Sequence, residues 1–262
     1  MSGLLIAGAL IEVPGVVVIG PHEAKWSQLS PGDYRQRRGS PHQVMLHTTK
    51  GDWPQKIMAG AGPAGRAERT AAMWGDDPAY SGAHIVVGSD GVVACLADLE
   101  LVEAYHATVS NPFSIGIEIY QEAGGMIYQA ALDAAVKVCD VIAETCSIPR
   151  QYPRKPYLHR PLDRMLNGGR DVYGFVGHRD NTDRRGRGDP GDAIFDALAV
   201  AGYEGFDIAA GEDLTAWKRR QARLNQLGET LTVDGLPGPS TIAALRKHGY
   251  TSGRALDVAA VF

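Results

Sequence analysis

Residues 114–146 change from the periodicity of a β-strand to that of an α-helix, and this change limits the folds open to the chain. In the segment SIGIEI the isoleucines alternate at Ile115, Ile117 and Ile119, which is the period of a strand with one buried face. In the segment after it, small and apolar residues recur every three or four positions, at Ala131, Ala135, Val138, Cys139, Ile142 and Cys146. This spacing predicts an amphipathic helix that packs on a sheet.

Other short apolar segments supply the remaining strands of the predicted sheet. HQVML is typical of a buried strand that leads to His47, and YGFVGH predicts another strand that ends at His178. GAHIVVGSDGVVACLAD predicts two short strands joined by an SDG turn, and GDAIFDALAVAGY predicts a closing helix. Strands and helices mix without regular alternation, so we expect an α/β fold with a mixed central β-sheet flanked by helices.

The chain begins with an apolar segment, MSGLLIAGALIEVPGVVVIGP. It has no basic residue near its start, and a glutamate and a proline interrupt it, so it predicts neither a signal peptide nor a membrane span. We expect two strands, Leu4–Val13 and Val16–Gly20, that turn at Pro14–Gly15 and form a β-hairpin. Residues 1–40 are expected to lie at the periphery of the main domain.

A domain boundary is expected near residues 202–213, GYEGFDIAAGED. Beyond it, Pro239 opens a predicted helix at a position where a missing N–H costs little. The helix before it is predicted from the spacing of Leu214, Trp217, Gln221, Leu224 and Leu227. We therefore expect a main domain over residues 1–205 and a small helical module over residues 213–262. A module of this size is small for an independent fold, so we expect it to lean on the main domain.

The composition narrows the classes of function. The 262 residues are 44% hydrophobic and 21% charged, as in a soluble globular protein. A net charge of −4 gives no support for nucleic acid as the main partner. Three cysteines without a CxxC pair do not make a disulfide framework, and we expect Cys95, Cys139 and Cys146 to be free and buried.

Two predicted strands end in histidines, His47 and His178, and Asp189 follows the second across a glycine-rich loop. Two neutral imidazoles and one carboxylate make a three-ligand zinc site, whose open fourth position is typical of a catalytic metal. Such a site holds a water that the metal acidifies. The alternative is a pair of hydrogen-bonded structural histidines beside a common DPG turn, and spacing alone leaves both interpretations open.

Six segments occur in one order along the chain: VMLHTT, SGAHIVVGSDG, AYHA, SIGIEI, GHRD and RGDPG. Together they resemble the zinc-dependent N-acetylmuramoyl-L-alanine amidases of the peptidoglycan-recognition-protein type, over roughly residues 40–200. The later segment LNQLGETLTVDGLPGPSTIAALR resembles the small helical peptidoglycan-binding module, with Pro237 where that module usually has an aromatic residue. The resemblance implies a catalytic domain over residues 1–205 and a wall-binding module over residues 213–262.

The resemblance also implies roles for single residues. The zinc ligands would be His47, His178 and Asp189. Glu118 of SIGIEI matches the acidic residue that handles the proton of the zinc-bound water, although a strand residue that faces solvent would look the same.

Two further positions match residues around the substrate. His106 of AYHA matches a histidine that lines the substrate cleft, or else only buttresses the site. Arg187 stands where many members of the family carry a lysine that stabilises the oxyanion. Arginine keeps the positive charge but has a different reach and geometry, and a solvated loop arginine is the alternative.

The function implied is a zinc-dependent hydrolase that cleaves the amide bond between N-acetylmuramic acid and L-alanine in peptidoglycan. A phage or prophage lysin is expected, made in the cytoplasm and acting at the cell wall after release, while a wall-recycling enzyme is the other possibility of this class. Two alternatives remain from other classes: a peptidoglycan-recognition protein that does not cleave, and a zinc peptidase that cuts another amide of the stem peptide.

Overall fold

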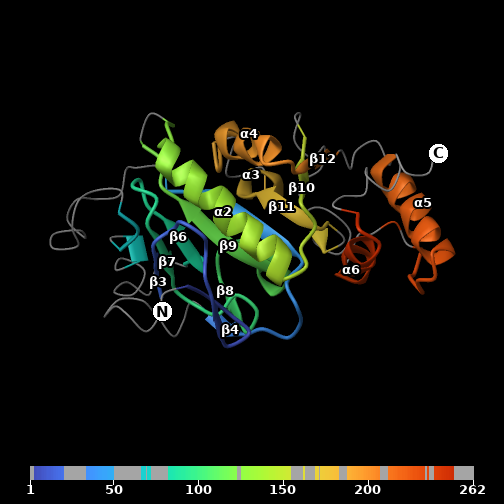
Figure 1. The fold of residues 1–262 in the computed structure, drawn as a ribbon. Coiled ribbons are helices and arrows are strands. Elements are labelled where there is room, and N and C mark those ends of the chain that lie inside the picture. The colour runs from blue at the N-terminus through green and yellow to red at the C-terminus, as the bar shows by residue number, and fades with distance from the viewer. Residues whose placement is uncertain are drawn as a thin grey trace.

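The structure is a computed structural model. It shows a sheet with helices packed on it and, at the C-terminal end, two helices set beside this unit (Figure 1). The described residues are 3–20, 34–49, 66–68, 70–71, 82–122, 125–154, 162, 169–170, 172–182, 188–206, 212–233, 235 and 239–250.

A six-stranded mixed sheet forms the centre of the structure, as the sequence predicts. In spatial order its strands are β11 (Gly174–Gly177), β5 (Gln43–Thr48), β9 (Ser114–Ile119), β6 (Ile85–Val87), β7 (Val93–Cys95) and β3 (Val18–Ile19). The first four run parallel to one another, and β7 returns antiparallel to β6. The carboxyl ends of β11, β5 and β9 therefore meet at one edge of the sheet, which is where α/β folds place their ligand sites.

One face of the sheet is covered by α2 (Gln129–Thr145) and α4 (Asp192–Val200) (Figure 1). Ile115, Ile117 and Ile119 of β9 are fully buried on this face. They share one core cluster with the residues that the helical spacing picked out, Ala131, Ala135, Val138, Cys139, Ile142 and Cys146. The predicted helix on a sheet is thus confirmed, and the three cysteines are free and buried, as expected.

The opposite face of the sheet carries the alternate side chains of the same strands. Met45 and Val176 pack there with Ala107 in a separate cluster. Two short elements adjoin the strands on this side, the 3-10 helix η2 (Thr108–Phe113) beside β9 and the helix α3 (His178–Asn181) beside β5 and β11. Among the described residues, the part of this face at β5, β9 and β11 contacts these short elements, and polar side chains of the strands lie there.

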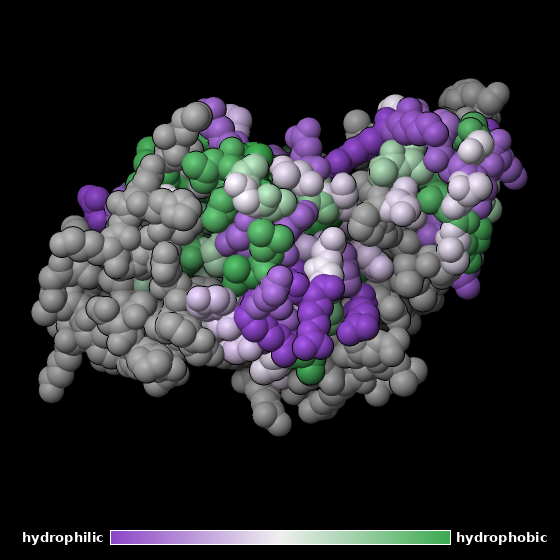
Figure 2. Space-filling model, turned by 90° about the horizontal axis from the view of Figure 1, so that it is seen from below, coloured by the Kyte–Doolittle hydropathy of each residue, from purple (hydrophilic) through white to green (hydrophobic). Residues whose placement is uncertain are grey.

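In the described part of the chain, three two-stranded sheets accompany the central one, and one of them is the N-terminal hairpin. β4 (Tyr34–Gln36) pairs antiparallel with β8 (Val102–Ala104), and β10 (Gln151–Pro153) pairs parallel with β12 (Glu204–Phe206). All three residues of β4 are exposed, and β4 lies at the lower side of Figure 1. Seen from below, hydrophilic side chains gather near the centre of the surface, with apolar ones beside them (Figure 2).

The N-terminal hairpin differs from the predicted one. β1 (Leu4–Ile6) and β2 (Ala9–Ile11) pair antiparallel and turn at Ala7–Gly8, not at Pro14–Gly15. Both turn residues have positive φ, 50° and 80°, which gives a two-residue turn the twist that matches its strands. Their N–H groups donate to the carboxylate of buried Asp98, at 3.1 and 2.7 Å.

The second predicted N-terminal strand is reduced to β3, and it does not pair in the hairpin. It lies at the edge of the central sheet, parallel to β7. The N-terminal segment contributes to the main core through Leu4, Ile6, Val13 and Val18. The apolar pattern predicted that this strand pairs within the hairpin, but it pairs with the edge of the central sheet instead.

The C-terminal helices are α5 (Glu212–Gln226) and α6 (Pro239–Lys247). They have a small cluster of their own, made of Trp217, Leu224, Ala244 and Leu245. Arg246 donates from its guanidinium to the main-chain oxygens of Ala143 and Glu144, at 3.0 Å each. This contact ties α6 to the carboxyl end of α2, where a cation also satisfies free helix carbonyls. Within the described ranges, every helix is too short or too polar to span a lipid bilayer.

Candidate metal centre

The two strand-end histidines and the aspartate come together at one edge of the sheet. His47 is in β5, His178 is the first residue of α3 directly after β11, and Asp189 lies in the turn before α4. Each offers one ligand atom, and these atoms all lie within 4.8 Å of one another. All three side chains are buried. The ligand group predicted from the sequence is therefore assembled by the pairing of β5 with β11.

Asp189 is held in place by main-chain contacts. Its Oδ1 accepts the N–H of Thr48 at 3.0 Å, and the Thr48 hydroxyl donates to the carbonyl of Gly188 at 3.0 Å. On the other side, the N–H of Arg179 donates to the main-chain oxygen of Asp189 at 2.6 Å. The DPG turn is thus attached both to the strand of His47 and to the helix of His178.

The guanidinium of Arg179 also fixes this turn. It donates to the carbonyl of Pro190 at 3.2 Å and to Asp192 Oδ1 at 2.8 Å, and it stacks over the ring of Phe195 at 4.3 Å. Arg179 belongs to the GHRD motif, but no role was predicted for it from the sequence. The residues that it contacts come shortly after Asp189 in the sequence. The only sequence signal for this role was therefore the short distance along the chain between Arg179 and the DPG segment.

The arrangement of His178 and Asp189 fits a shared cation. His178 Nδ1 and Asp189 Oδ2 are 3.2 Å apart, yet Nδ1 is buried and makes no hydrogen bond within the described residues. Buried polar atoms almost always have a partner, and a cation that both atoms face would supply it. Two imidazoles and a carboxylate are also a donor set that zinc prefers, with ligand bonds of about 2.0–2.2 Å.

Glu118 stands beside His47 on the next strand. The parallel register pairs the two residues directly, so their side chains leave the sheet on the same face. Ile117 and Ile119 point to the helix-covered core, while Glu118 is half-buried on the other face. The predicted orientation of Glu118, opposite to the isoleucines, is confirmed.

His106 lies against His47. His47 Nε2 and His106 Nδ1 are 3.0 Å apart, and the two rings meet edge to face. The His106 ring occupies the space above Gly116 of β9, where a Cβ would lie 2.6 Å from its Cγ. Desolvation, with His47 and His84 as further causes, holds the pKa of His106 well below its ordinary value. A neutral ring at this position can accept a hydrogen bond from His47.

Further buried polar groups lie behind His106, and they were not predicted from the sequence. They include Arg37 and His84, which are 7% and 0% exposed. Burial lowers the pKa of His84 to about 3, with the nearby Arg37 as a second cause. His84 directly precedes the apolar strand β6, and a lone histidine in this apolar segment was the available signal. Arg187, the candidate oxyanion residue, lies outside the described residues.

Comparison with known proteins places the chain in a family. The sequence profile of the N-acetylmuramoyl-L-alanine amidases matches residues 37–192, and a search of curated proteins finds no match. Among solved structures, the catalytic domain of XlyA is similar, with 17% identity over 70% of this chain and 99% of that chain and a TM-score of 0.44.

Two further solved structures are similar to this chain. One is the endolysin of the Thermus scotoductus bacteriophage Ph2119, with 17% identity over 71% of this chain and 99% of that chain and a TM-score of 0.43. The other is a Drosophila PGRP-LB variant in complex with tracheal cytotoxin, with 16% identity over 72% of this chain and 96% of that chain and a TM-score of 0.44.

Proposed function

Because the chain belongs to the N-acetylmuramoyl-L-alanine amidase family, we propose that it is a zinc-dependent hydrolase of peptidoglycan. The bond cleaved is the amide that joins the lactyl group of N-acetylmuramic acid to L-alanine. The proposal includes His47, His178 and Asp189 as zinc ligands and Glu118 as the general base.

The position of Glu118 carries the proposal. Its carboxylate leaves the sheet beside His47, on the face that also holds His178 and Asp189. A protein that only binds peptidoglycan needs no proton acceptor next to a set of metal ligands. A hydrolase needs one, because a carboxylate at this place can take a proton from the attacking water and return it to the leaving amine.

Each residue of the site has a separate role in the proposed hydrolysis. His47, His178 and Asp189 would hold zinc, which supplies a Lewis acid for the scissile carbonyl and acidifies a water at neutral pH. Glu118 accepts the proton of that water and passes it to the amine of L-alanine as the amide bond breaks. Arg187 is proposed to stabilise negative charge on the carbonyl oxygen, and His106 is proposed to line the cleft beside the substrate.

The test is product analysis on purified peptidoglycan. Mass spectrometry should show stem peptides with a new N-terminal L-alanine, released by the native protein and not by Glu118→Gln. Zinc removal should abolish release, and added zinc should restore it. Glu144→Gln is the matched control, since Glu144 is exposed on α2, on the far side of the sheet, and it should release peptide at the native rate.

The same experiment separates the alternatives. Peptides that begin at another residue of the stem would identify a peptidase instead of an amidase. Binding to the wall with no release of peptide, by a chain shown to contain zinc, would contradict the proposed hydrolase and favour a recognition protein.

The proposal extends to the C-terminal helices. Residues 1–205 would form the catalytic domain, and residues 213–262 would bind the wall and raise the local concentration of substrate. The separate cluster around Trp217 and Leu224 supports a distinct unit. A lysin that acts on polymeric wall after release from the cytoplasm fits such a unit best. Glu118→Gln should therefore sediment with intact sacculi, whereas a recycling enzyme should prefer soluble wall fragments.

A further inference from the structure

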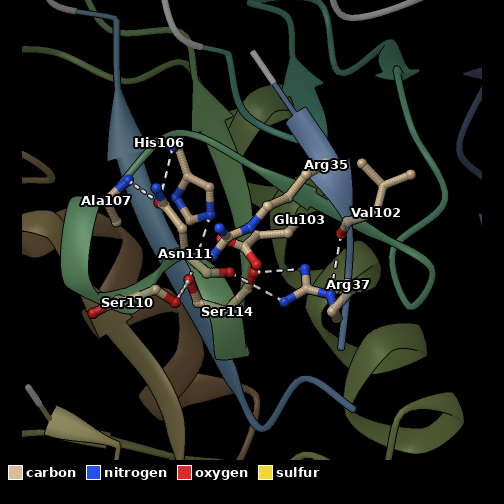
Figure 3. Close-up of polar contacts among 9 residues, drawn as sticks. All are labelled: Arg35, Arg37, Val102, Glu103, His106, Ala107, Ser110, Asn111 and Ser114. Atoms are coloured by element: carbon tan, nitrogen blue, oxygen red, sulfur yellow. Dashed lines mark hydrogen bonds and ion pairs between the residues drawn. The ribbon is translucent and has the colours of Figure 1, made fainter. Parts of the chain in front are cut away.

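A buried arginine, Arg37, lies behind His106 at the end of β4. Its guanidinium donates to three main-chain oxygens, those of Val102 at 3.1 Å, Asn111 at 3.2 Å and Ser114 at 2.9 Å (Figure 3). These oxygens belong to β8, η2 and β9 respectively. One side chain thus joins three segments of the sheet face that carries the candidate metal centre.

Arg37 keeps its charge without a carboxylate partner among the described residues. The nearby buried carboxylate of Glu103 pairs with Arg35 instead, at 2.8 Å. Burial lowers the pKa of Arg37 to about 10, which leaves it protonated at neutral pH. Burial of a charge that is compensated by carbonyl oxygens alone costs free energy of folding. A functional reason for this residue is therefore expected in the segments that it joins.

The segments that Arg37 joins are those that hold His106. Asn111 Oδ1 accepts the N–H groups of His106 at 3.0 Å and Ala107 at 2.6 Å. The hydroxyl of Ser114 lies 3.4 Å from His106 Nε2. Asn111 and Ser114 therefore contact His106 through their side chains and Arg37 through their main-chain oxygens, as Figure 3 shows.

The ring of His84 backs His106 on the same side. The N–H of Gly116 donates to His84 Nδ1 at 3.0 Å, so the other nitrogen, Nε2, carries the proton and donates to the Val102 oxygen at 2.9 Å. The His84 and His106 rings meet edge to face at 5.6 Å, and Arg37 Nη2 lies 3.1 Å from His84 Nε2.

The hydrogen bonds around His106 have one consistent direction. Ser114 donates its hydroxyl proton to the Ser110 oxygen at 2.7 Å, so its oxygen is available to accept from His106 Nε2–H. His106 Nδ1 then carries no proton and accepts from His47 Nε2–H. His47 would consequently be left with Nδ1 to hold a metal, in line with the rule that a ligating histidine donates its other ring N–H.

We propose that Arg37 is a positioning residue of the metal centre, which holds His106 in the one tautomer and place that orient His47 as a ligand. This inference rests on the proposed function for the identity of the metal site. Arg37 does not touch the ligands and acts on them through Asn111, Ser114 and His106.

The test compares the full chain with Arg37→Met and Arg37→Lys by two readouts that need no catalysis. Two-bond ¹H–¹⁵N spectra report the ring tautomer of His106, and competition with a chelator reports zinc affinity. In the native protein His106 should be protonated at Nε2 alone. In Arg37→Met the two tautomers should mix, and zinc affinity should fall about 10-fold or more. Arg37→Lys should show the same change to a smaller degree. Lysine keeps the positive charge but lacks the planar guanidinium that donates to several oxygens at once.

Arg246→Met is the matched control. Arg246 also donates to main-chain oxygens, at the end of α2, so its loss should lower stability without a change in the His106 tautomer or in zinc affinity.

Three results would overturn the inference. The first is a native His106 protonated at Nδ1, and the second is a native tautomer and zinc affinity in a folded Arg37→Met. If Arg37→Met does not fold, the third is native behaviour of Arg37→Lys. Absence of peptide release by the native protein would contradict the proposed function and leave these readouts intact.

Discussion

The main-chain N–H of Thr48 donates to Asp189 Oδ1 at 3.0 Å, across 141 residues of sequence. Thr48 follows His47 in β5, so this bond attaches the aspartate directly to the strand of the first candidate ligand. The second carboxylate oxygen, Oδ2, is thereby left facing His178. One oxygen of Asp189 positions the side chain, and the other is available to a metal.

Arg179→Met should loosen the turn that carries Asp189. The variant loses donors to Pro190 and Asp192 and the contact with Phe195, so we expect the free energy of unfolding to fall by about 1–3 kcal/mol. Zinc affinity should fall about 10-fold, as is typical when a residue that supports a ligand is removed. Urea unfolding and chelator competition measure the two effects. Arg154→Met, at an exposed arginine, should keep native affinity, and equal affinities in both variants would contradict the role of Arg179.

Zinc should stabilise the folded chain, and His178→Ala should abolish this effect. A ligand that binds only the folded state at 100 times its dissociation constant adds about 2.7 kcal/mol to the free energy of unfolding. Thermal melting with and without zinc should therefore show a clear rise for the native chain and none for the variant. His248→Ala, which removes a hydrogen bond to Glu229 in the C-terminal unit, should keep the zinc-dependent rise. A rise retained by His178→Ala would remove it from the ligand set.

Gly116→Ala should displace His106. The added Cβ would lie 2.6–2.8 Å from three atoms of the imidazole, which no rotation of a methyl group relieves. We expect a loss of about 1–3 kcal/mol in the free energy of unfolding, as in other overpacked interiors, together with weaker zinc binding. Gly39→Ala has open space around its Cβ and should match the native protein in both. Native zinc affinity in Gly116→Ala would show that His106 does not influence the ligands.

His84 should make the protein less stable in acid. The unfolded chain takes up a proton at this residue near pH 6.5, while the pKa in the folded chain is about 3. Between these values the unfolded state binds more protons, so the free energy of unfolding falls as the pH is lowered, by up to about 1.4 kcal/mol per pH unit. His84→Asn, whose side-chain oxygen can still accept the Gly116 N–H, should show a smaller fall between pH 6.5 and pH 4.

Urea unfolding over this pH range measures the effect of His84. Gln129→Asn is the control, since Gln129 is exposed and carries no titratable group, and it should keep the native slope. Identical slopes for His84→Asn and the native chain would mean that His84 is not the group responsible.

The periodicity of apolar residues predicted those elements that bury one face along their whole length. β9 and α2 are of this kind, because each presents its apolar residues to the same core. β4 and β10 could not be predicted, since they are three residues long and their partners lie far along the chain. The hairpin turn was misplaced because a Pro–Gly pair is a strong local signal, whereas the turn at Ala7–Gly8 depends on a carboxylate about 90 residues away.

The candidate ligands were predictable for a similar reason. His47 and His178 follow apolar segments, and parallel strands bring such ends together at one edge of a sheet. Arg37 and Asn111 could not be found in this way, because they act largely on main-chain atoms. Every residue carries the same main-chain atoms, so the sequence gives no sign of which carbonyl a side chain will reach.

The pairing of β5 with β11 has a consequence for folding during synthesis on the ribosome. The first candidate ligand emerges early, whereas its partner strand and the DPG turn are made more than a hundred residues later. Contacts of such long range form only when both segments are present. A nascent chain that ends before Asp189 therefore cannot bring the three candidate ligands together. Zinc binding would show that synthesis has continued beyond this residue.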